Sequence, residues 1–259
     1  MRLDKYLTEC GYADSRTRAE KLIVSGGVSV DGKSITKPSF DINEAIEHVI
    51  EITLEEKYVS RGGLKLEGAL ASFDIDVTGL EVIDVGASTG GFTHCLLLRG
   101  ASGVTALDSG HGQLHEKIRN DKRVRVIEGY NARNIDPADV GTFDGAVMDV
   151  SFISQTLILP ALVSVIKDGG FYIGLIKPQF EAGRAALSKG GIVKSASDRE
   201  AAILKVIESA RSNGLKLIGL IKSPIEGGDG NIEYLAHFKK DSGAMLDVID
   251  RNKIKEICK

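Results

Sequence analysis

The amino-acid sequence predicts an α/β fold, with a mostly parallel sheet that carries helices on both faces, preceded by a small N-terminal α+β unit. From about residue 80, short runs rich in Val, Ile and Leu alternate with amphipathic stretches, which is typical of strand–helix–strand units. The preceding residues instead combine two short helical patterns with a hairpin signal. Together these patterns predict a first unit at 1–60, a linker and entry helix at 61–79, a sheet domain at 80–245, and a C-terminal helix or tail at 246–259.

Composition and charge narrow the class of protein. A net charge of −3 means that any contact with nucleic acid must come from a local basic patch. The longest apolar run, at 157–166, is too short to span a bilayer, and the N-terminus lacks the apolar segment of a secretion signal. The spacing of Cys10, Cys95 and Cys258 fits neither a zinc site nor a disulfide framework. We therefore expect a cytoplasmic protein with no metal and no stable membrane association.

Two short helices are expected in the first unit. Leu3 and Leu7 give the first helix an apolar face, and Gly11 ends it. Ser15 is a suitable N-cap for a second helix over residues 16–25.

A small sheet is expected after these helices. Residues 28–35 alternate apolar and polar side chains about Asp31-Gly32, which is a strong hairpin signal. Residues 48–53 have the pattern of a further strand. The first unit is therefore predicted to mix helices with a few short strands.

Seven strands are expected in the larger domain. The last two follow one another without an intervening helix, so we expect the final strand to be antiparallel and inserted at the edge of the sheet. Residues 55–79 connect the two domains and include a helix that enters the second. The predicted strands are 81–85, 103–108, 123–128, 143–150, 170–177, 214–223 and 232–239, with a long helix at 197–214.

A glycine-rich loop follows the first of these strands and indicates a nucleotide-bearing ligand. Asp108, at the end of the next strand, lies 22 residues after Gly86, the distance at which an acid binds ribose hydroxyls. Ser88 replaces the second glycine of the dinucleotide fingerprint, so S-adenosylmethionine fits better than NAD. A tight turn without a ligand, and for Asn131 a loop cap instead of an adenine contact, are the alternatives. The candidate cofactor residues are Gly86, Ala87, Ser88, Thr89, Gly90, Gly91, Phe92, Asp108 and Asn131.

Four charged residues are expected at the same edge of the sheet. Asp149 and Lys177 end two parallel strands, and Glu233 starts the strand expected to be antiparallel. Lys65, in the preceding helix, is the fourth candidate. The set suits a weakly acidic hydroxyl that attacks a sulfonium methyl, with a lysine accepting the proton. Each residue alone fits a solvated turn or a helix cap equally well.

The sequence "DVSF" at 149–152 argues against methylation of a base amine, because enzymes of that class commonly carry an Asn/Asp-Pro-Pro-aromatic run there. A cytosine-carbon methylase needs a reactive cysteine at such a site, and neither Cys95 nor Cys258 is placed for it.

The whole chain resembles the TlyA family, also called haemolysin A. The motifs that carry the resemblance are "RLDKYL", "SRTRAEKLIVSGGVSVDG", "VSRGGLKLEGAL", "DVGASTGGFT", "MDVSFIS", "IKPQFE" and "GGDGNIEYL". The resemblance implies an αL-type RNA-binding domain followed by a Rossmann-like methyltransferase domain similar to the FtsJ ribose 2′-O-methyltransferases. It implies that Lys65, Asp149, Lys177 and Glu233 form the catalytic tetrad, and that Gly86, Ser88, Gly90 and Asp108 bind S-adenosylmethionine.

The resemblance also implies the substrate. The acceptor class is ribosomal RNA or a ribosomal subunit, with a cytidine ribose as target, and the chain is similar to the shorter family form, associated with the large subunit. A haemolysin that acts on membranes and a catalytically inactive RNA-binding protein are the alternatives. The sequence indicates no oligomeric state. The candidate RNA-binding residues are Arg2, Lys5, Arg16, Arg18, Lys21 and Lys33, whose charges would grip phosphates if they share one face.

Overall fold

A computed structural model of the chain describes residues 1–24, 27–52, 57–227, 230–240 and 249–259. Parts of several predicted segments lie outside the described residues: Ser25 of the second helix, Thr53 of the strand at 48–53, residues 228–229 of the "GGDGNIEYL" motif, and residues 241–248 around the expected boundary at 245. The chain divides into two compact units, Met1–Lys57 and Tyr58–Lys259, which are described separately.

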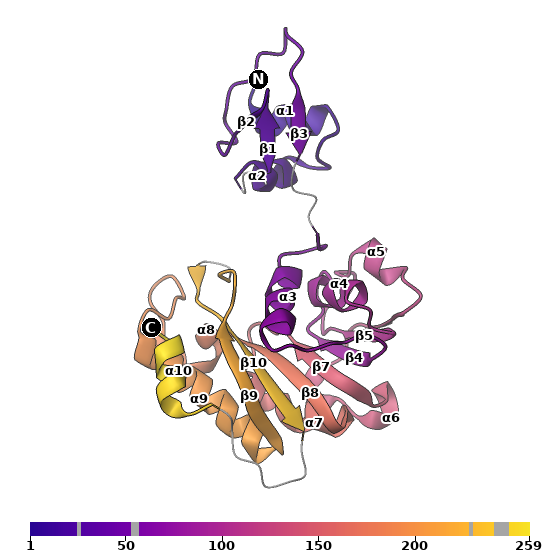
Figure 1. Ribbon diagram of the computed structural model, residues 1–259, viewed down its shortest axis with the longest axis vertical. Helices are drawn as coiled ribbons and strands as arrows, with labels where there is room; N and C mark the ends of the chain where they lie inside the picture. The colour runs from indigo at the N-terminus through magenta and orange to yellow at the C-terminus, as the bar shows by residue number, and fades with distance from the viewer. Residues whose placement is uncertain (25–26, 53–56, 228–229, 241–248) are drawn as a thin grey trace. The chain divides into compact units, whose positions relative to one another are not determined.

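The first unit contains two helices and a three-stranded antiparallel sheet. Helices α1 (Leu3–Glu9) and α2 (Arg16–Val24) precede strands β1 (Val28–Val30), β2 (Lys33–Ser34) and β3 (Ile50–Ile52), in the order β2-β1-β3 (Figure 1). The predicted hairpin is confirmed, because Val30 pairs with Lys33 across Asp31 and Gly32. Both turn residues have positive φ, +50° and +75°, as a two-residue hairpin of type I′ requires.

The predicted helix ends of the first unit are also present. Gly11 follows α1 with φ of +77°, and the Ser15 hydroxyl accepts a hydrogen bond from the Arg18 amide at 3.3 Å. The apolar faces of the two helices and of β1 form one small core, which includes Leu3, Leu7 and Ile23.

The second unit is built on a seven-stranded sheet in the order β6-β5-β4-β7-β8-β10-β9. Neighbouring strands from β6 to β8 are parallel, and β10 is antiparallel to both β8 and β9. The mostly parallel α/β sheet predicted from the sequence is therefore confirmed. The strands are β4 (Glu81–Val85), β5 (Gly103–Leu107), β6 (Val124–Ile127), β7 (Phe143–Met148), β8 (Ile166–Ile176), β9 (Leu215–Lys222) and β10 (Tyr234–Lys240).

Helices cover both faces of this sheet and bury two separate cores (Figure 1). On one face pack α3 (Gly62–Ser72), α4 (Gly91–Leu98) and α5 (Glu116–Arg119). On the other pack α6 (Pro137–Val140), α7 (Leu159–Val165), α9 (Ala196–Ser212) and α10 (Arg251–Ile257). The shorter elements are α8 (Pro178–Glu181) and the 3₁₀ turns Ala132–Asn134, Gln155–Leu157 and Arg184–Ala186.

The position of the last strand differs from the expectation. β10 is antiparallel, as predicted, but it lies between β8 and β9 instead of at the edge. Residues Tyr234 to Phe238 of β10 are all buried, whereas β9 alternates buried and partly exposed side chains and ends at the exposed Lys222. The more polar strand takes the edge because an edge strand keeps one side in contact with water.

Within the described parts of the chain, every helix is too short or too polar to cross a lipid bilayer.

Candidate active site

The loop between β4 and α4 turns through three residues with left-handed backbone. Gly86 and Gly90 have φ of +83° and +91°, and Ser88 has φ of +48°. A side chain at Gly86 would meet the backbone oxygen of Asp149 at 2.5 Å, so the loop can pack on the end of β7 only with glycine there. The loop therefore lies directly against the segment that carries Asp149.

Asp108, at the end of β5, holds this loop in place. Its carboxylate accepts hydrogen bonds from the backbone amides of Ser88, at 2.8 Å, and Gly110, at 2.7 Å. The first bond supports the unusual backbone of Ser88, because a charged acceptor strengthens a hydrogen bond. Asp108 is only half-buried, and each carboxylate oxygen retains a further lone pair for a ligand hydroxyl.

A cavity of about 270 Å³ opens beside the loop. Gly86 to Thr89, Gly91 and Phe92 line it together with three of the four predicted catalytic residues, Lys65, Asp149 and Lys177. Among the described residues, the lining does not include Gly90, Asp108, Asn131 or Glu233.

The predicted catalytic residues form two ion pairs. In the first, the Lys65 ammonium on α3 donates a hydrogen bond of 2.5 Å to Glu233, immediately before β10. Both side chains are buried, at 10% and 2% exposure, so water screens this pair little. In the second, the Lys177 nitrogen lies 2.6 Å from Asp149 Oδ1. The contact lacks hydrogen-bond alignment, and Lys177 donates instead to the Ser151 hydroxyl at 2.8 Å.

Sheet topology brings the two pairs to one edge. Asp149 directly follows β7 and Lys177 directly follows β8, so both lie at the carboxyl ends of parallel strands. β10 runs the opposite way, and Tyr234 pairs with Ile176, which places Glu233 level with Lys177. Four separate elements thus contribute one charge each to the same edge of the sheet.

A buried acid lies close to the cavity and was not singled out from the sequence. Asp84 on β4 is fully buried, and burial raises its pKa to about 7, with a further contribution from the negative charge of Asp149. One carboxylate oxygen accepts a 2.6 Å hydrogen bond from the Thr93 hydroxyl, and the other has no hydrogen-bond partner among the described residues. A cationic ligand in the cavity would offset the negative charge gathered here.

Three further residues, of which Ser151 and Arg61 line the cavity, were not singled out from the sequence. Ser151 binds Lys177, and Arg61 donates a 2.8 Å hydrogen bond to the backbone oxygen of Glu226. The third, Phe152, is 91% exposed, and its backbone has φ of +65°, which is rare for an aromatic residue. Its ring centroid lies 5.2 Å from that of Phe180. The only sequence signal for Phe152 is its place in "DVSF", three residues after Asp149, and in the sequence this motif bears only on base-amine chemistry.

Asn131 has a local role in the described structure. Its side chain accepts a 3.1 Å hydrogen bond from the Arg133 amide and caps the 3₁₀ turn Ala132–Asn134. This is the loop-cap geometry that the sequence left open beside an adenine contact.

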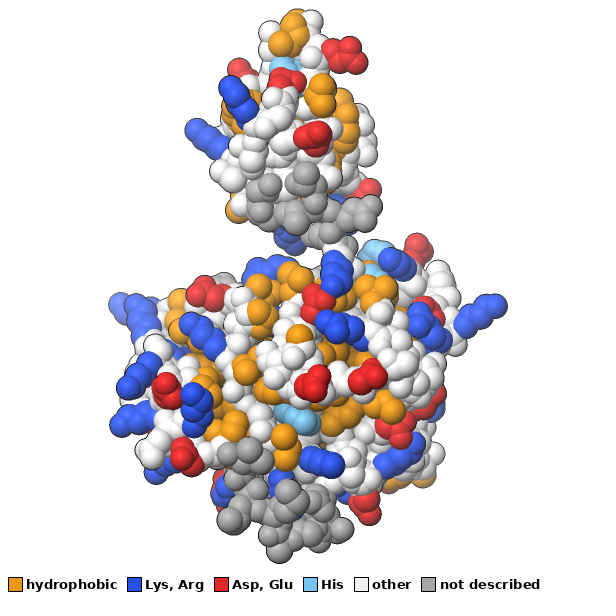
Figure 2. Space-filling view, in the orientation of Figure 1, with side chains coloured by type: hydrophobic (Ala, Val, Ile, Leu, Met, Phe, Trp, Pro, Cys, Tyr) orange, Lys and Arg blue, Asp and Glu red, His pale blue; other side chains and the backbone are white. Residues whose placement is uncertain are grey.

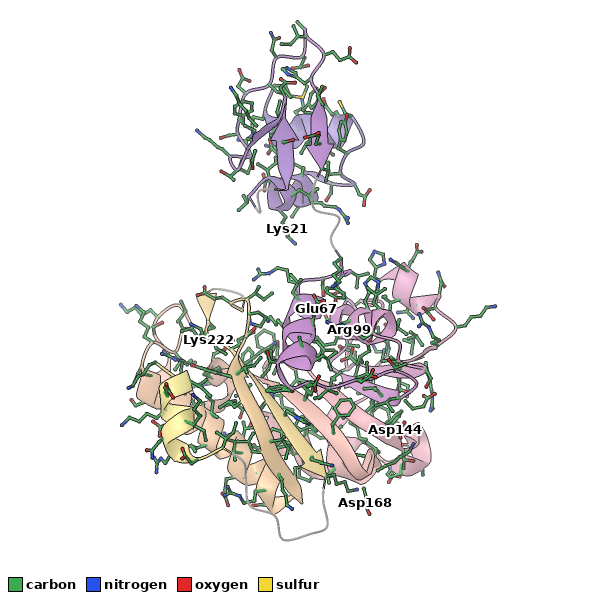
Figure 3. The ribbon with its side chains drawn as sticks, in the orientation of Figure 1. Lys21, Glu67, Arg99, Asp144, Asp168 and Lys222 are labelled. Atoms are coloured by element: carbon green, nitrogen blue, oxygen red, sulfur yellow. The ribbon has the colours of Figure 1, made fainter. Side chains whose placement is uncertain are left out.

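All six candidate RNA-binding residues of the first unit are exposed. Arg2 and Arg16 both bind the buried carboxylate of Asp4, at 2.9 Å. Lys5 pairs with Glu9 at 3.5 Å and Arg18 with Asp14 at 3.7 Å, which are loose contacts between exposed side chains. Lys21, labelled in Figure 3, and Lys33 complete the set.

The surface of the larger unit carries charges of both signs, and Asp144 and Asp168 each pair with a lysine. Figure 2 shows Lys and Arg side chains around the visible rim of this unit. In Figure 3, Lys222 at the end of β9 lies at the edge of the sheet that carries the cavity, whereas Asp144 and Asp168 lie at the opposite edge. No three His, Cys, Asp or Glu side chains cluster as metal ligands would within the described ranges.

Comparison with known proteins identifies close relatives. Residues 58–240 match the family described as FtsJ-like methyltransferase, and residues 1–45 match the S4 domain. The chain is 45% identical over 240 residues to Hemolysin A of Brachyspira hyodysenteriae, covering 92% of this chain and 99% of that protein. It is 42% identical over 246 residues to the 16S/23S rRNA (cytidine-2'-O)-methyltransferase TlyA of Mycobacterium tuberculosis, covering 95% and 92%. A solved structure from Streptococcus thermophilus, 43% identical, has a TM-score of 0.78 and covers 100% of this chain and 94% of that one.

Proposed function

Because this chain belongs to the TlyA/hemolysin A family of S-adenosylmethionine-dependent, FtsJ-like methyltransferases with an N-terminal S4 domain, we propose that it methylates a ribose 2′-hydroxyl of ribosomal RNA. The observation that carries this proposal is the meeting of two lysine–carboxylate ion pairs beside the glycine loop. That arrangement can accept a proton from a weakly acidic hydroxyl at the place where a methyl donor is held.

The residues around the cavity fit S-adenosylmethionine. The glycine loop gives a ligand access to the backbone, and Asp108 has oxygens available for the ribose hydroxyls. Asp149, in the cavity wall, supplies negative charge that suits a cationic ligand, and such a ligand would favour ionisation of the buried Asp84. When bound, S-adenosylmethionine supplies a methyl group activated by its sulfonium. Asn131 fits a loop cap better than an adenine contact, so its role in cofactor binding rests on the sequence alone.

Lys177 is the residue best suited to remove the hydroxyl proton. It lines the cavity, and its nitrogen lies between Asp149 and Ser151. Lys177 would accept the hydroxyl proton, and the bound cofactor would supply its methyl group to the ribose oxygen, with the carbon–sulfur bond broken and the uncharged thioether as leaving group. Lys65 and Glu233, paired and buried, orient the acceptor and keep the site electrically balanced.

The exposure of Phe152 favours recognition of an acceptor nucleotide that is flipped out of the RNA base stack. An aromatic side chain that is 91% exposed beside Ser151 offers a face on which a single base can stack. Its positive φ is the kind of local strain that concentrates at functional sites. Stacking of the acceptor base would bring its ribose to the two ion pairs.

The first unit would bind the RNA outside the acceptor nucleotide. Its exposed arginines and lysines suit RNA phosphates, in a protein whose net charge of −3 excludes binding through overall charge. The M. tuberculosis relative is named for both 16S and 23S rRNA, and from it we propose that the acceptor is a cytidine ribose. That large-subunit RNA is the principal substrate rests on the resemblance of the sequence to the shorter family form. A ribosomal substrate implies activity in the cytoplasm.

Transfer of a labelled methyl group tests the proposal. Purified chain and labelled S-adenosylmethionine are incubated with separated large and small subunits and with their deproteinised RNAs, and the RNA is then digested to nucleosides. We expect label in 2′-O-methylcytidine from the large subunit, and none with a Lys177→Ala variant that still binds cofactor. Label in a methylated base would contradict ribose chemistry. Leakage from liposomes without methyl transfer would favour the haemolysin alternative.

A further inference from the structure

One carboxylate organises two of the basic residues in the first unit. Asp4 on α1 is 0% exposed and accepts hydrogen bonds from Arg2 Nε and Nη2, each at 2.9 Å. The same carboxylate accepts from Arg16 Nε at 2.9 Å and from the Lys5 amide at 3.0 Å. The Arg2 hydrogen bond, with help from Arg16, holds the pKa of Asp4 well below its usual range, so Asp4 stays ionised.

The two guanidinium groups still face water. Arg2 is 48% and Arg16 is 54% exposed, although the acid beneath them is completely covered. Arg2 Nη2 and Arg16 Nε bind the same oxygen of Asp4 at 2.9 Å, so they are at most twice that distance apart. Among the described residues, Nη1 of Arg2 and both terminal nitrogens of Arg16 make no hydrogen bond. The cluster therefore has several N–H donors left for a ligand and a net positive charge.

Other basic residues of this unit are held differently. Arg18 meets Asp14 at 3.7 Å, and Asp14 is 92% exposed. Lys5 meets Glu9 at 3.5 Å, and both are more than half exposed. Exposed pairs of this kind contribute little and leave the side chains mobile. Only around Asp4 does the described part of the unit show two arginines locked on one buried acid.

We propose that Asp4 is a positioning residue that locks Arg2 and Arg16 into a preformed clamp for an RNA phosphodiester. The inference rests on the proposed function, since it assumes that the first unit binds RNA. Guanidinium groups recognise phosphate by paired, directional hydrogen bonds. An arginine that is already ordered loses less conformational freedom on binding, so prior ordering by Asp4 strengthens the complex.

The clamp and a purely electrostatic account predict opposite changes in RNA affinity when the charge of Asp4 is removed. Asp4 is a negative charge beside two phosphate ligands, so its removal by Asp4→Asn would strengthen RNA binding if charge alone mattered. If Asp4 positions the arginines, the same change weakens binding, by about tenfold for the release of two ordered side chains. Asp14→Asn is the matched control, because it removes the same charge beside an arginine, but from an exposed acid instead of a buried one.

Filter binding to deproteinised large-subunit RNA at one fixed salt concentration measures the effect. We expect Asp4→Asn to bind about tenfold more weakly than the wild-type chain and Asp14→Asn to bind equally or more tightly. In an Arg2→Ala, Arg16→Ala background, Asp4→Asn should cause no further loss, whereas a merely structural role for Asp4 would still weaken binding. Calorimetry should show unchanged affinity for S-adenosylmethionine, which binds in the other unit.

Equal or tighter binding by a folded Asp4→Asn variant would overturn the inference. If circular dichroism shows that this variant unfolds the first unit, Arg16→Lys decides, because it keeps the charge but loses the guanidinium fork. A loss of affinity in Arg16→Lys supports the clamp, and wild-type affinity overturns it. These results are separable from the proposed function: a wild-type chain that binds RNA but transfers no methyl group refutes the methyltransferase proposal alone.

Discussion

Gly227→Ala should disable the site while leaving the fold almost intact. Gly227 is buried beside the carboxylate of Glu233, and a methyl group added there would lie 2.2 Å from Oε1, 2.5 Å from Cδ and 3.1 Å from Oε2. Carbon atoms of this kind do not approach other atoms more closely than 3.0 Å, so the whole carboxylate has to withdraw by about 1 Å. The part that moves is the end of a flexible side chain, so the cost to folding is small.

The displacement is large on the scale of the interaction it disturbs. Glu233 binds Lys65 through Oε2 at 2.5 Å, and a shift of the carboxylate by about 1 Å disturbs the distance and the alignment of this hydrogen bond. Misplacement of about 1 Å in a reacting constellation costs on the order of 10²-fold in rate.

The rate of methyl transfer is measured in single-turnover experiments at saturating RNA and cofactor. The unfolding free energy of the same samples is measured by urea titration. Gly190→Ala is the matched control, because a side chain there would meet nothing within 4 Å and its φ is not positive. We expect about 10²-fold slower transfer for Gly227→Ala, with unfolding free energies close to wild type for both variants. A normal rate in a folded Gly227→Ala variant would show that the Lys65–Glu233 pair is not needed for the reaction.

Four other changes have defined outcomes. Asp108→Ala should weaken cofactor binding by about 1.5–3 kcal/mol through lost charged hydrogen bonds, and unchanged affinity in titration calorimetry would contradict this role. Lys177→Arg should slow single-turnover transfer by about 10²–10⁴-fold, because a guanidinium keeps the ion pair but does not release its proton; near-normal turnover would leave Lys177 only an electrostatic part. Phe152→Ala should lower kcat/KM for RNA by the equivalent of about 1–3 kcal/mol without changing the midpoint of urea unfolding, since the ring is 91% exposed; an unaltered kcat/KM would rule out stacking. Burial lowers the pKa of His237 from 6.5 to about 4, so the unfolded chain binds the extra proton in this range. The contribution of His237 to the unfolding free energy should be fully present above pH 6.5 and fall toward pH 4 by up to about 1.4 kcal/mol per pH unit, with a sign opposite to that of the contribution of Asp84. It is measured as the difference in unfolding free energy between the wild-type chain and His237→Phe across this range, and a difference that does not change with pH would contradict it.

Much of the sheet and part of the site could be anticipated because they depend on local pattern. Asp149 and Lys177 each follow a buried apolar run, so a parallel sheet brings them to one edge whatever the side-chain details. The Asp31-Gly32 hairpin was predictable for a similar reason, since both residues tolerate positive φ.

Other features depend on contacts between distant segments, which no local pattern records. The pairing of Lys65 with Glu233 joins residues 168 positions apart and is decided by the packing of α3 on the sheet. The insertion of β10 between β8 and β9 depends on which of two similar strands is buried on both faces. Likewise, Arg2 and Arg16 were predicted from their charge, but nothing in the sequence shows that they share Asp4.

The position of β10 in the sheet affects how the enzyme folds while it is synthesised on the ribosome. A nascent chain that ends after β9 has made six of the seven strands, yet the hydrogen-bonding edge of β8 is still open, because its neighbour is β10. Synthesis proceeds from the N-terminus, so the sheet closes only when Tyr234 to Lys240 emerge. Glu233 immediately precedes this strand, so it emerges from the ribosome together with β10. Closure of the exposed edge and completion of the four-charge site are therefore one event, and a prematurely terminated chain would be both inactive and prone to aggregate.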